Sequence, residues 1–304
     1  MCTPYKPASD WGHARCVLAC KRAAACYAFH HCPLIPHSPL ATLHLHAMSP
    51  MSTNQVTVTA LGDRAWTLSW HSPIDLEVNS NVMAVSQTLI GLQQKGALIG
   101  VTDVVPAFCA LTVFYDPLIA NAQAIKSQLE ACANAPAPAT AATRHWHLPV
   151  CFEDHWAPDL PDLVRHAKLD PESVCAALTQ CTLRCHAMGF LPGFAYLATL
   201  PPALHMPRLA TPRTRVPAQS LAVAGGMAAV YPADSPGGWR LVGHMPVPLF
   251  DAQDATSAAL LRAGDDVTFY AVTAAECEAI ARAVERDPSQ RWIYAASTES
   301  GASA

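Results

Sequence analysis

The sequence is short of charge, and it lacks the patterns that lead a chain into a membrane or onto nucleic acid. Its 23 acidic and 19 basic residues give a net charge of -4, which leaves no basic surface for a nucleic-acid partner. No run approaches the roughly 18 uninterrupted apolar residues that a membrane span needs. With 304 residues, 51% of them hydrophobic, the chain is long enough for two ordinary domains. We therefore expect a soluble globular protein.

The sequence also lacks a self-sufficient catalytic motif. No Gly-x4-Gly-Lys-Ser/Thr loop is present, so any ATP is not bound through a P-loop. Ser220 and Ser235 do not stand in the Gly-x-Ser-x-Gly pattern of a nucleophile elbow. Cys181, Cys185 and His186 have the elements of a thiol site, but apolar thiols that simply pack explain them as well. These absences predict a site that partner proteins complete.

The first fifty residues hold five of the twelve cysteines, together with six histidines and a Pro-rich tract. A zinc site is one interpretation, but no Cys-x2-Cys pair occurs. A signal peptide is another, but Lys21 and Arg22 interrupt the apolar stretch it needs. We predict that residues 1–50 are a disordered or mis-started extension, with Met48 or Met51 as the native start. The other cysteines are scattered through a long chain, which is typical of reduced thiols in the cytoplasm.

Regular patterns begin at residue 54. Apolar alternation predicts a hairpin of strands at 55–60 and 65–70. Apolar residues at steps of four and three then predict a helix over 78–92, ended by Gly96. Two further strands (97–105 and 107–115) and a helix (118–133) complete a two-layer α/β domain over 54–133. The Pro/Ala-rich tract at 134–144 is typical of a linker.

The rest of the chain predicts a β-rich domain over 145–285, followed by a C-terminal tail at 286–304. A strand is expected at 146–152 and a short helix at 160–167. Asp170 before Pro171 is typical of a helix start. Short apolar runs divided by Gly and Pro indicate an all-β barrel or sandwich, with strand candidates at 221–224, 228–231, 240–242 and 267–272.

Four segments carry a resemblance to a known family. They read GFLPGFAYL at 189–197, PRLATPRTRVP at 207–217, AGGMAAVYP at 224–232 and SPGGWRLVG at 235–243. In order and spacing they resemble the carboxyltransferase-type domain of the 5-oxoprolinase B subunit, also called allophanate hydrolase subunit 1, whose family includes sporulation-kinase inhibitors. The resemblance covers roughly residues 54–285. It implies an α+β fold, with a small N-terminal two-layer α/β domain followed by a cyclophilin-like β-barrel domain.

The chain departs from the family pattern at several positions. Gln219 stands where the family usually has glycine, and Met227 and Ala228 stand where it usually has polar residues. His244 replaces an arginine, and imidazole does not offer the two-pronged donor of a guanidinium. These changes favour a binding role over catalysis at those positions.

The resembling segments also supply the candidate site residues. Arg208, Arg213 and Arg215 form a basic cluster, which suits either a substrate carboxylate or ordinary surface ion pairs. Tyr196, Tyr231 and Trp239 suit either a pocket wall or the core. We assign catalytic roles to Arg213, Arg215 and Tyr231, and expect no metal. The predicted substrate-binding residues are Pro192, Gly193, Phe194, Tyr196, Arg208, Gln219, Gly225, Gly226, Ser235, Gly237, Gly238 and Trp239.

The glycines and prolines among these residues have two interpretations. They can serve turn geometry alone. They can also form stiff loops that present backbone N–H groups to an oxyanion or a phosphate.

The resemblance implies a non-autonomous component of an ATP-dependent 5-oxoprolinase, which opens 5-oxoproline to glutamate. ATP would be shared with two partner proteins, one of the allophanate hydrolase subunit 2 type (the 5-oxoprolinase C subunit) and one of the lactam-utilisation type (the A subunit). Two alternatives stay open. One is a binding protein that inhibits a sensor histidine kinase, and the other is a carboxyltransferase half-site like that of urea carboxylase, which would work with biotin carried on another chain.

Overall fold

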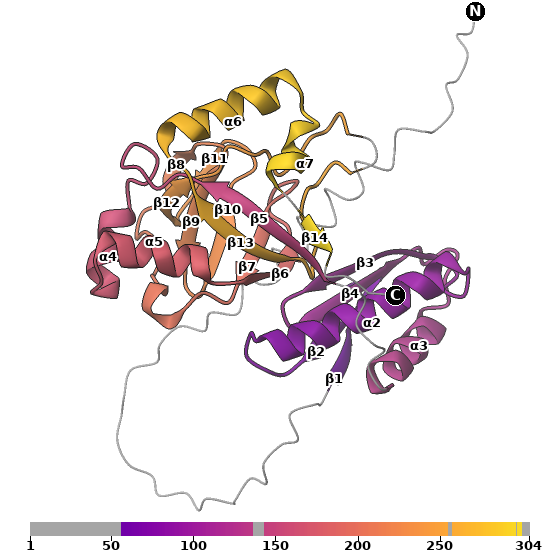
Figure 1. Cartoon of the computed structure of the whole chain (residues 1–304). Helices are drawn as coiled ribbons and strands as arrows, with labels where there is room; N and C mark the ends of the chain where they lie inside the picture. The colour runs from indigo at the N-terminus through magenta and orange to yellow at the C-terminus, as the bar shows by residue number, and fades with distance from the viewer. Residues whose placement is uncertain (1–55, 136–142, 255–256, 296, 300–304) are drawn as a thin grey trace, which may run out of the picture.

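The computed structural model describes residues 56–135, 143–254, 257–295 and 297–299 (Figure 1). The predictions for residues 1–50, including a start at Met48 or Met51, lie outside the described residues. So does most of the segment predicted as a linker.

The N-terminal part has the predicted β-β-α-β-β-α order. Asp75 begins the first described helix by accepting a hydrogen bond from the Val78 N–H at 2.8 Å, and Gly96, at φ +72°, follows its end. Both helices lie on the same face of the four strands (Figure 1). The elements are β1 (Val56–Ala60), β2 (Ala65–Trp70), α2 (Leu76–Gln94), β3 (Val101–Ala107), β4 (Ala110–Tyr115) and α3 (Ala122–Asn134).

The C-terminal part combines short strands with helices at its periphery. Asp170 begins α5 as predicted, accepting from the Ser173 N–H at 2.8 Å. The strands are β5 (Arg144–Val150), β6 (Leu183–Met188), β7 (Ala195–Ala198), β8 (Arg213–Val216), β9 (Ser220–Ala224), β10 (Met227–Val230), β11 (Ser235–Gly237), β12 (Arg240–His244), β13 (Asp266–Ala271) and β14 (Ser297–Glu299). The helices are α4 (Leu160–Ala167), α5 (Pro171–Gln180), the 3-10 turn η1 (Pro202–Leu204), α6 (Ala274–Arg286) and α7 (Gln290–Tyr294).

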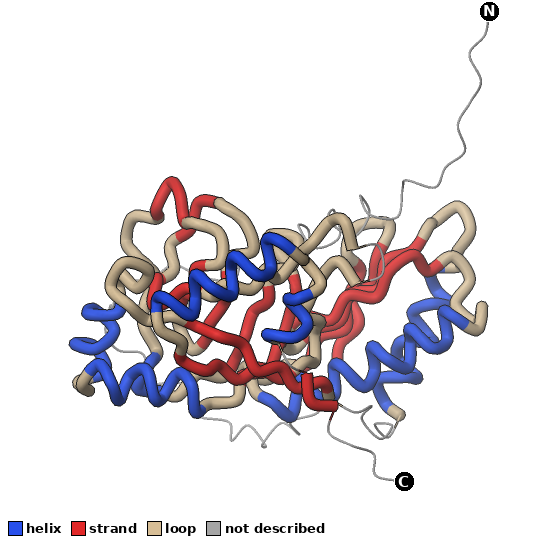
Figure 2. The backbone as a smooth tube through the Cα atoms, turned by 45° about the horizontal axis from the view of Figure 1, so that its top comes forward, coloured by secondary structure: helices blue, strands red, loops and turns tan. Residues whose placement is uncertain are grey.

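One sheet of 12 strands runs through both parts (Figure 2). Its order is β1-β2-β4-β3-β6-β7-β10-β9-β12, with β13 beside β6 and β5 between β13 and β14. The two parts join where Ala107 of β3 pairs with Ala187 of β6, next to a bond from the Phe108 N–H to the His186 carbonyl at 2.9 Å. Two separate apolar cores flank this junction.

The prediction of a closed β-barrel is wrong, because the strand ladder of the C-terminal part is open. The ladder ends at β12 on one side and at β14, beside β5, on the other, and β12 reaches the end of β5 only at an isolated bridge between Cys151 and His244. A register shift between Leu241 and Gly243 bends β12 just before this bridge, and such bulges interrupt ladder pairing. The architecture is therefore a mixed α/β fold around a large, mainly antiparallel, open sheet.

The C-terminal end differs from the predicted tail at 286–304. Helix α7 places Trp292 against Trp146 with ring centroids 5.9 Å apart, and β14 pairs antiparallel with β5. Helix α6 was not predicted, although Thr273 and Glu276 form a reciprocal capping box at its start. The described residues therefore stay attached to the sheet up to β14, which ends at residue 299.

Within the described ranges, no helix is both long and apolar enough to cross a membrane.

Candidate functional site

The aromatic residues of the predicted site pack into one cluster on the face of β7, β9 and β10. Phe194 meets Tyr196, Tyr231 and Trp239 edge-on, with ring centroids 4.9, 5.3 and 6.2 Å away. Phe194, Tyr231 and Trp239 are buried, whereas Tyr196 is half-buried. Such edge-on pairs favour a fixed geometry, so the cluster forms a rigid floor.

Arg208 lies at the surface above this aromatic floor. Its Cζ atom is 5.9 Å from the centre of the Trp239 ring, a cation–π distance. Burial raises the pKa of the Tyr196 and Tyr231 hydroxyls, and the positive charge of Arg208 partly offsets that rise. No carboxylate pairs with Arg208 among the described residues. The structure thus joins an unpaired guanidinium to two phenols.

The loop before β12 fixes the position of Arg208. The Leu209 N–H donates to the Gly238 carbonyl at 2.7 Å, which ties the arginine segment to the double-glycine turn. Glycine is required at position 237, because a Cβ there would overlap the Tyr231 hydroxyl. Gly238 has no comparable restriction.

The other double glycine forms the turn between β9 and β10. Gly225 adopts φ +57° and exchanges two backbone hydrogen bonds with Met206, two residues before Arg208. Gly226 lies against the ring of His205, whose Nε2 atom is 2.9 Å from the Leu200 carbonyl. Both double-glycine turns therefore support the Arg208 segment through backbone contacts and close packing.

Arg213 and Arg215 are occupied elsewhere. Arg213 donates from Nη2 to Oδ1 of the buried Asp159 at 2.8 Å. The exposed Arg215 pairs with Asp234. The predicted basic cluster is therefore divided, and Arg208 is its member without an ion-pair partner among the described residues.

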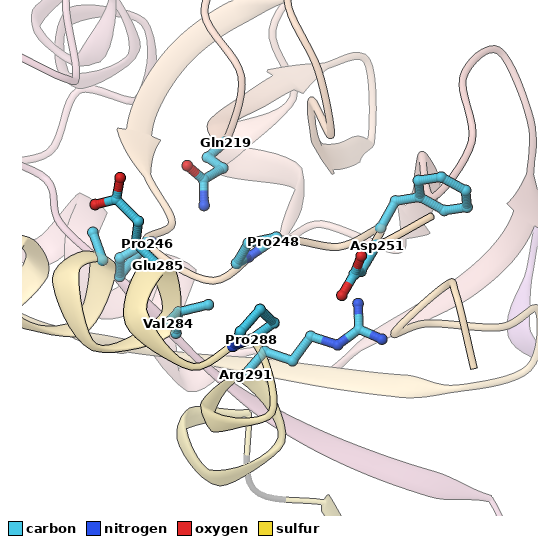
Figure 3. A pocket seen from close by; sticks show the side chains of 10 residues that line it. Gln219, Pro246, Pro248, Asp251, Val284, Glu285, Pro288 and Arg291 are labelled. Carbon is cyan, nitrogen blue, oxygen red and sulfur yellow. The ribbon is translucent and has the colours of Figure 1, made fainter. Parts of the chain in front are cut away.

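One of the remaining predicted residues, Gln219, lines a cavity of about 450 Å³ (Figure 3). Gln219 lines it from the β8–β9 turn, at φ +64°, a backbone conformation that favours glycine. Arg291 also lines it, but its guanidinium is held by Asp254 at 2.7 Å. The other lining residues are Pro246, Pro248, Phe250, Asp251, Ala281, Val284, Glu285 and Pro288.

The loop of Pro192 and Gly193 packs next to this cavity. A Cβ at Gly193 would lie 2.7 Å from the Cβ of Phe250, so the loop and the cavity rim are in close contact. Ser235 lies in β11, paired with Val216, and its buried Oγ finds no hydrogen-bond partner in the described ranges.

The arrangement around Arg208 is suited to an anion with an apolar body. A guanidinium can donate two parallel hydrogen bonds to a carboxylate, the phenols add two polar groups, and the aromatic floor receives the apolar part. The described residues contain no group of three His, Cys, Asp or Glu placed to hold a metal ion.

Sequence reasoning missed three residues that shape the site: His205, Asp159 and Phe190. The ring of Phe190 is edge-on to that of Phe194, with centroids 5.3 Å apart.

Residues 56–261 match the family model described as carboxyltransferase domain, subdomain C and D, and the chain belongs to this family. Within it, the chain is similar to the 5-oxoprolinase B subunit of Bacillus subtilis, with 31% identity covering 73% of this chain and 95% of the relative. The corresponding B subunits of Haemophilus influenzae and Escherichia coli O157:H7 are 30% and 32% identical over 70% and 69% of this chain, and 97% and 93% of their own. The predicted family is confirmed.

Solved structures share the fold. The protein TTHA0988 aligns with a TM-score of 0.60 and 33% identity over 69% of this chain, but this match spans only 40% of that longer chain. The urea carboxylase of Kluyveromyces lactis aligns with a TM-score of 0.61 and 19% identity over 78% of this chain and 23% of its own, which shows a shared fold alone.

Proposed function

We propose that this chain is a partner-dependent component of an ATP-dependent 5-oxoprolinase, which converts 5-oxoproline, ATP and water to glutamate. The observation that carries the proposal is the unpaired guanidinium of Arg208 above Trp239 and beside two phenols. The names of the curated relatives supply the substrate.

In this proposal Arg208 binds the carboxylate of 5-oxoproline. Its planar fork matches the two oxygens, and Trp239 holds the guanidinium from below. The pyrrolidone ring lies toward Phe190 and Tyr196, where one exposed and one half-buried aromatic ring remain accessible. Tyr231, held by its contact with Gly237, marks the inner end of the site.

The proposed reaction needs ATP because an unactivated lactam is a poor electrophile. Transfer of the γ-phosphoryl group to the lactam oxygen, with ADP as the leaving group, activates the lactam carbon. One water adds to that carbon and the C–N bond breaks, which frees the amine and leaves a γ-glutamyl phosphate. A second water hydrolyses this acyl phosphate to glutamate and phosphate. The sequence has no P-loop, so we assign the ATP site to surfaces shared with the companion A and C subunits. Cytoplasmic assembly fits the described residues, among which no disulfide links the cysteines.

An exposed apolar tip supports the dependence on partners. Ile99, Leu118 and Ile119 are 71, 90 and 64% exposed. Their two loops are held together by a hydrogen bond from the Asp116 N–H to the Gly100 carbonyl at 2.8 Å. Exposed apolar groups of this kind mark interaction surfaces. We assign the tip to contact with a companion protein.

Reconstitution tests the proposal. The purified chain is mixed with both companion subunits, and glutamate release from 5-oxoproline is followed with and without ATP. We expect release only when all three proteins and ATP are present. ATP-dependent release by the chain alone would contradict partner dependence, and no release by the full mixture would contradict the assigned reaction.

The two alternative functions remain hypotheses. The resemblance in fold to urea carboxylase carries no substrate, because identity with that protein is 19%. A role as a kinase inhibitor rests on the substitutions at Gln219, Met227, Ala228 and His244. His244 stacks on Trp156 with ring centroids 5.0 Å apart, and burial lowers its pKa, so it contributes to packing.

A further inference from the structure

A second cavity, of about 210 Å³, lies where the N-terminal and C-terminal parts meet. We call it the seam cavity. Helix α2 contributes Ser80 and Gln87, the start of β5 contributes Arg144, and β6 contributes Arg184. The turn before β13 adds Arg262, so three arginines from three segments line one small space.

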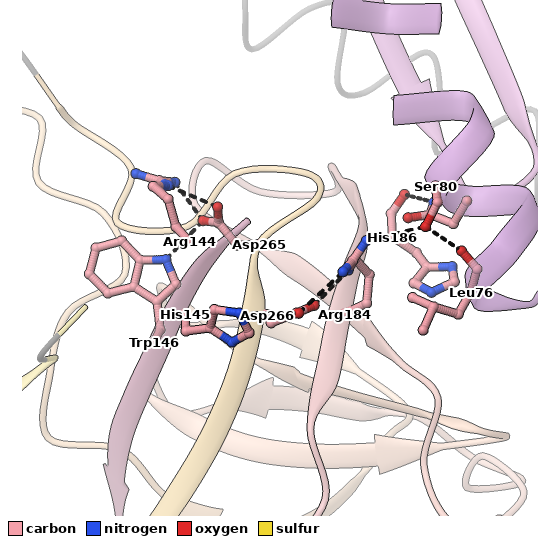
Figure 4. A network of polar contacts seen from close by, with 10 residues as sticks. Leu76, Ser80, Arg144, His145, Trp146, Arg184, His186, Asp265 and Asp266 are labelled. Carbon is pink, nitrogen blue, oxygen red and sulfur yellow. Dashed lines mark hydrogen bonds and ion pairs between the residues drawn. The ribbon is translucent and has the colours of Figure 1, made fainter. Parts of the chain in front are cut away.

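The two carboxylates beside the seam cavity are already engaged (Figure 4). Asp265 accepts from Arg144 Nε at 2.9 Å and from Arg144 Nη2, Trp146 Nε1 and the Arg262 backbone N–H. A carboxylate has about four acceptor positions, so Asp265 is saturated. Asp266 receives two prongs of Arg184, at 2.6 and 3.2 Å, with His145 Nε2 at 3.8 Å.

The remaining groups of the seam cavity include donors without a protein acceptor, and two of them, Arg262 and Gln87, are exposed to solvent. Within the described ranges, the side chains of Arg262, Gln87 and Thr143 make no hydrogen bond, and Arg262 has no ion-pair partner. Three guanidinium groups face two carboxylates, which leaves an excess of positive charge. A small space with surplus donors and surplus positive charge is complementary to a ligand that carries only acceptors and negative charge.

We propose that the seam cavity binds a small oxyanion, a phosphate or a carboxylate, with Arg262 as its principal ligand. The guanidinium of Arg262 presents a planar pair of donors, and Gln87 and Thr143 add neutral ones. The bound anion would contact α2 on one side and the β13 turn on the other, and would therefore strengthen the junction of the two parts. This site does not involve Arg208 and is independent of the proposed enzymatic function.

Titration of the full-length chain tests the seam cavity. Binding of inorganic phosphate and of acetate is measured by calorimetry and by the rise in melting temperature, against sodium chloride at matched ionic strength. We expect saturable binding of at least one of the two anions, and the comparison between them identifies the preferred oxyanion. Arg262→Ala should weaken that binding by about tenfold or more, as expected for a lost charged hydrogen bond.

Two further variants make the result specific. Arg64 is exposed in the turn between β1 and β2, so Arg64→Ala should bind like the wild type. Arg262→Lys retains the charge without the fork and should fall between the wild type and Arg262→Ala. No saturable binding of either anion, or equal binding by the wild type and Arg262→Ala, would overturn the proposal.

Discussion

Arg213 donates a hydrogen bond to the buried carboxylate of Asp159 at 2.8 Å, and the other oxygen of that carboxylate accepts from the Leu241 N–H at 2.6 Å. The pair links β8 to the start of α4 and to β12, three elements that are distant in sequence. Arg213 is 30% exposed and Asp159 is 8% exposed at their side chains, so this is a partly buried ion pair. In the structure the pair holds these three elements together, and the catalytic role assigned to Arg213 stays a prediction.

Arg213→Ala is expected to destabilise the protein by about 1–3 kcal/mol, because it leaves the Asp159 carboxylate buried with a partner missing. The melting temperature should fall by several degrees. Arg215→Ala is the matched control, since the Arg215–Asp234 pair is exposed and contributes little to stability. Equal melting temperatures for the two variants would contradict the structural role of Arg213.

Gln219→Gly is expected to stabilise the fold. Gln219 sits at φ +64°, where a residue with a Cβ carries strain of roughly 1 kcal/mol, and glycine relieves it. The gain corresponds to about 2–4 °C in melting temperature. Gln219→Ala retains the Cβ and should show no such gain. A lower melting temperature for the glycine variant than for the alanine variant would refute strain at this position.

His186 should make stability depend on pH. Its side chain is fully buried, and burial, helped by the charge of Arg184, lowers its pKa from 6.5 to about 4. Between these values the unfolded chain binds a proton that the folded chain does not, so stability falls as the pH is lowered. The shift corresponds to about 3 kcal/mol between pH 6.5 and 4.

The measurement compares urea unfolding of the wild type and His186→Asn from about pH 7 to about pH 4.5, a range that spans most of the shift. The variant can be less stable throughout, so the comparison rests on the slope of unfolding free energy against pH. The slope should be shallower in His186→Asn. Identical slopes in the two proteins would show that His186 does not titrate in this way.

The apolar tip predicts an assembly defect without a folding defect. Leu118→Asp together with Ile119→Asp should weaken association with the companion protein by about tenfold or more, because buried interface anchors dominate binding. Melting should hardly change, since both side chains are exposed. Ile293→Asp, at a position 65% exposed on α7, serves as the control. Unaltered association of the double variant would remove the tip from the interface.

Local features of the fold could be predicted from the sequence. The start of α5 and the glycine after α2 depend on residues within one helical turn, so neighbouring side chains specify them. The open ladder could not be predicted, because it depends on whether β12 meets β5, two strands about ninety residues apart in the chain. The strand β6, which joins both parts, was not predicted, although apolar and polar residues alternate from Leu183 to Ala187.

The candidate site divides in the same way. The resemblance identified the segments that carry Arg208, Tyr196, Tyr231 and Trp239, and the structure brings these four together. Which arginine is unpaired depends on Asp159 and Asp234. Asp159 is distant in the sequence from the arginines, so no pattern near them predicts its contact with Arg213. Likewise, Gln219 reaches a cavity whose acidic and basic residues come from distant segments.

Arg208 carries the central claim, and the most direct measurement is kcat/KM for 5-oxoproline in the reconstituted assembly. Arg208→Lys retains the charge but loses the planar fork, so we expect a fall of about ten- to a hundredfold, equivalent to about 1.5–3 kcal/mol. Arg215→Lys should have wild-type turnover, and both variants should melt within about a degree of the wild type. Wild-type kcat/KM for Arg208→Lys, in an assembly that is itself active, would contradict this account of the site.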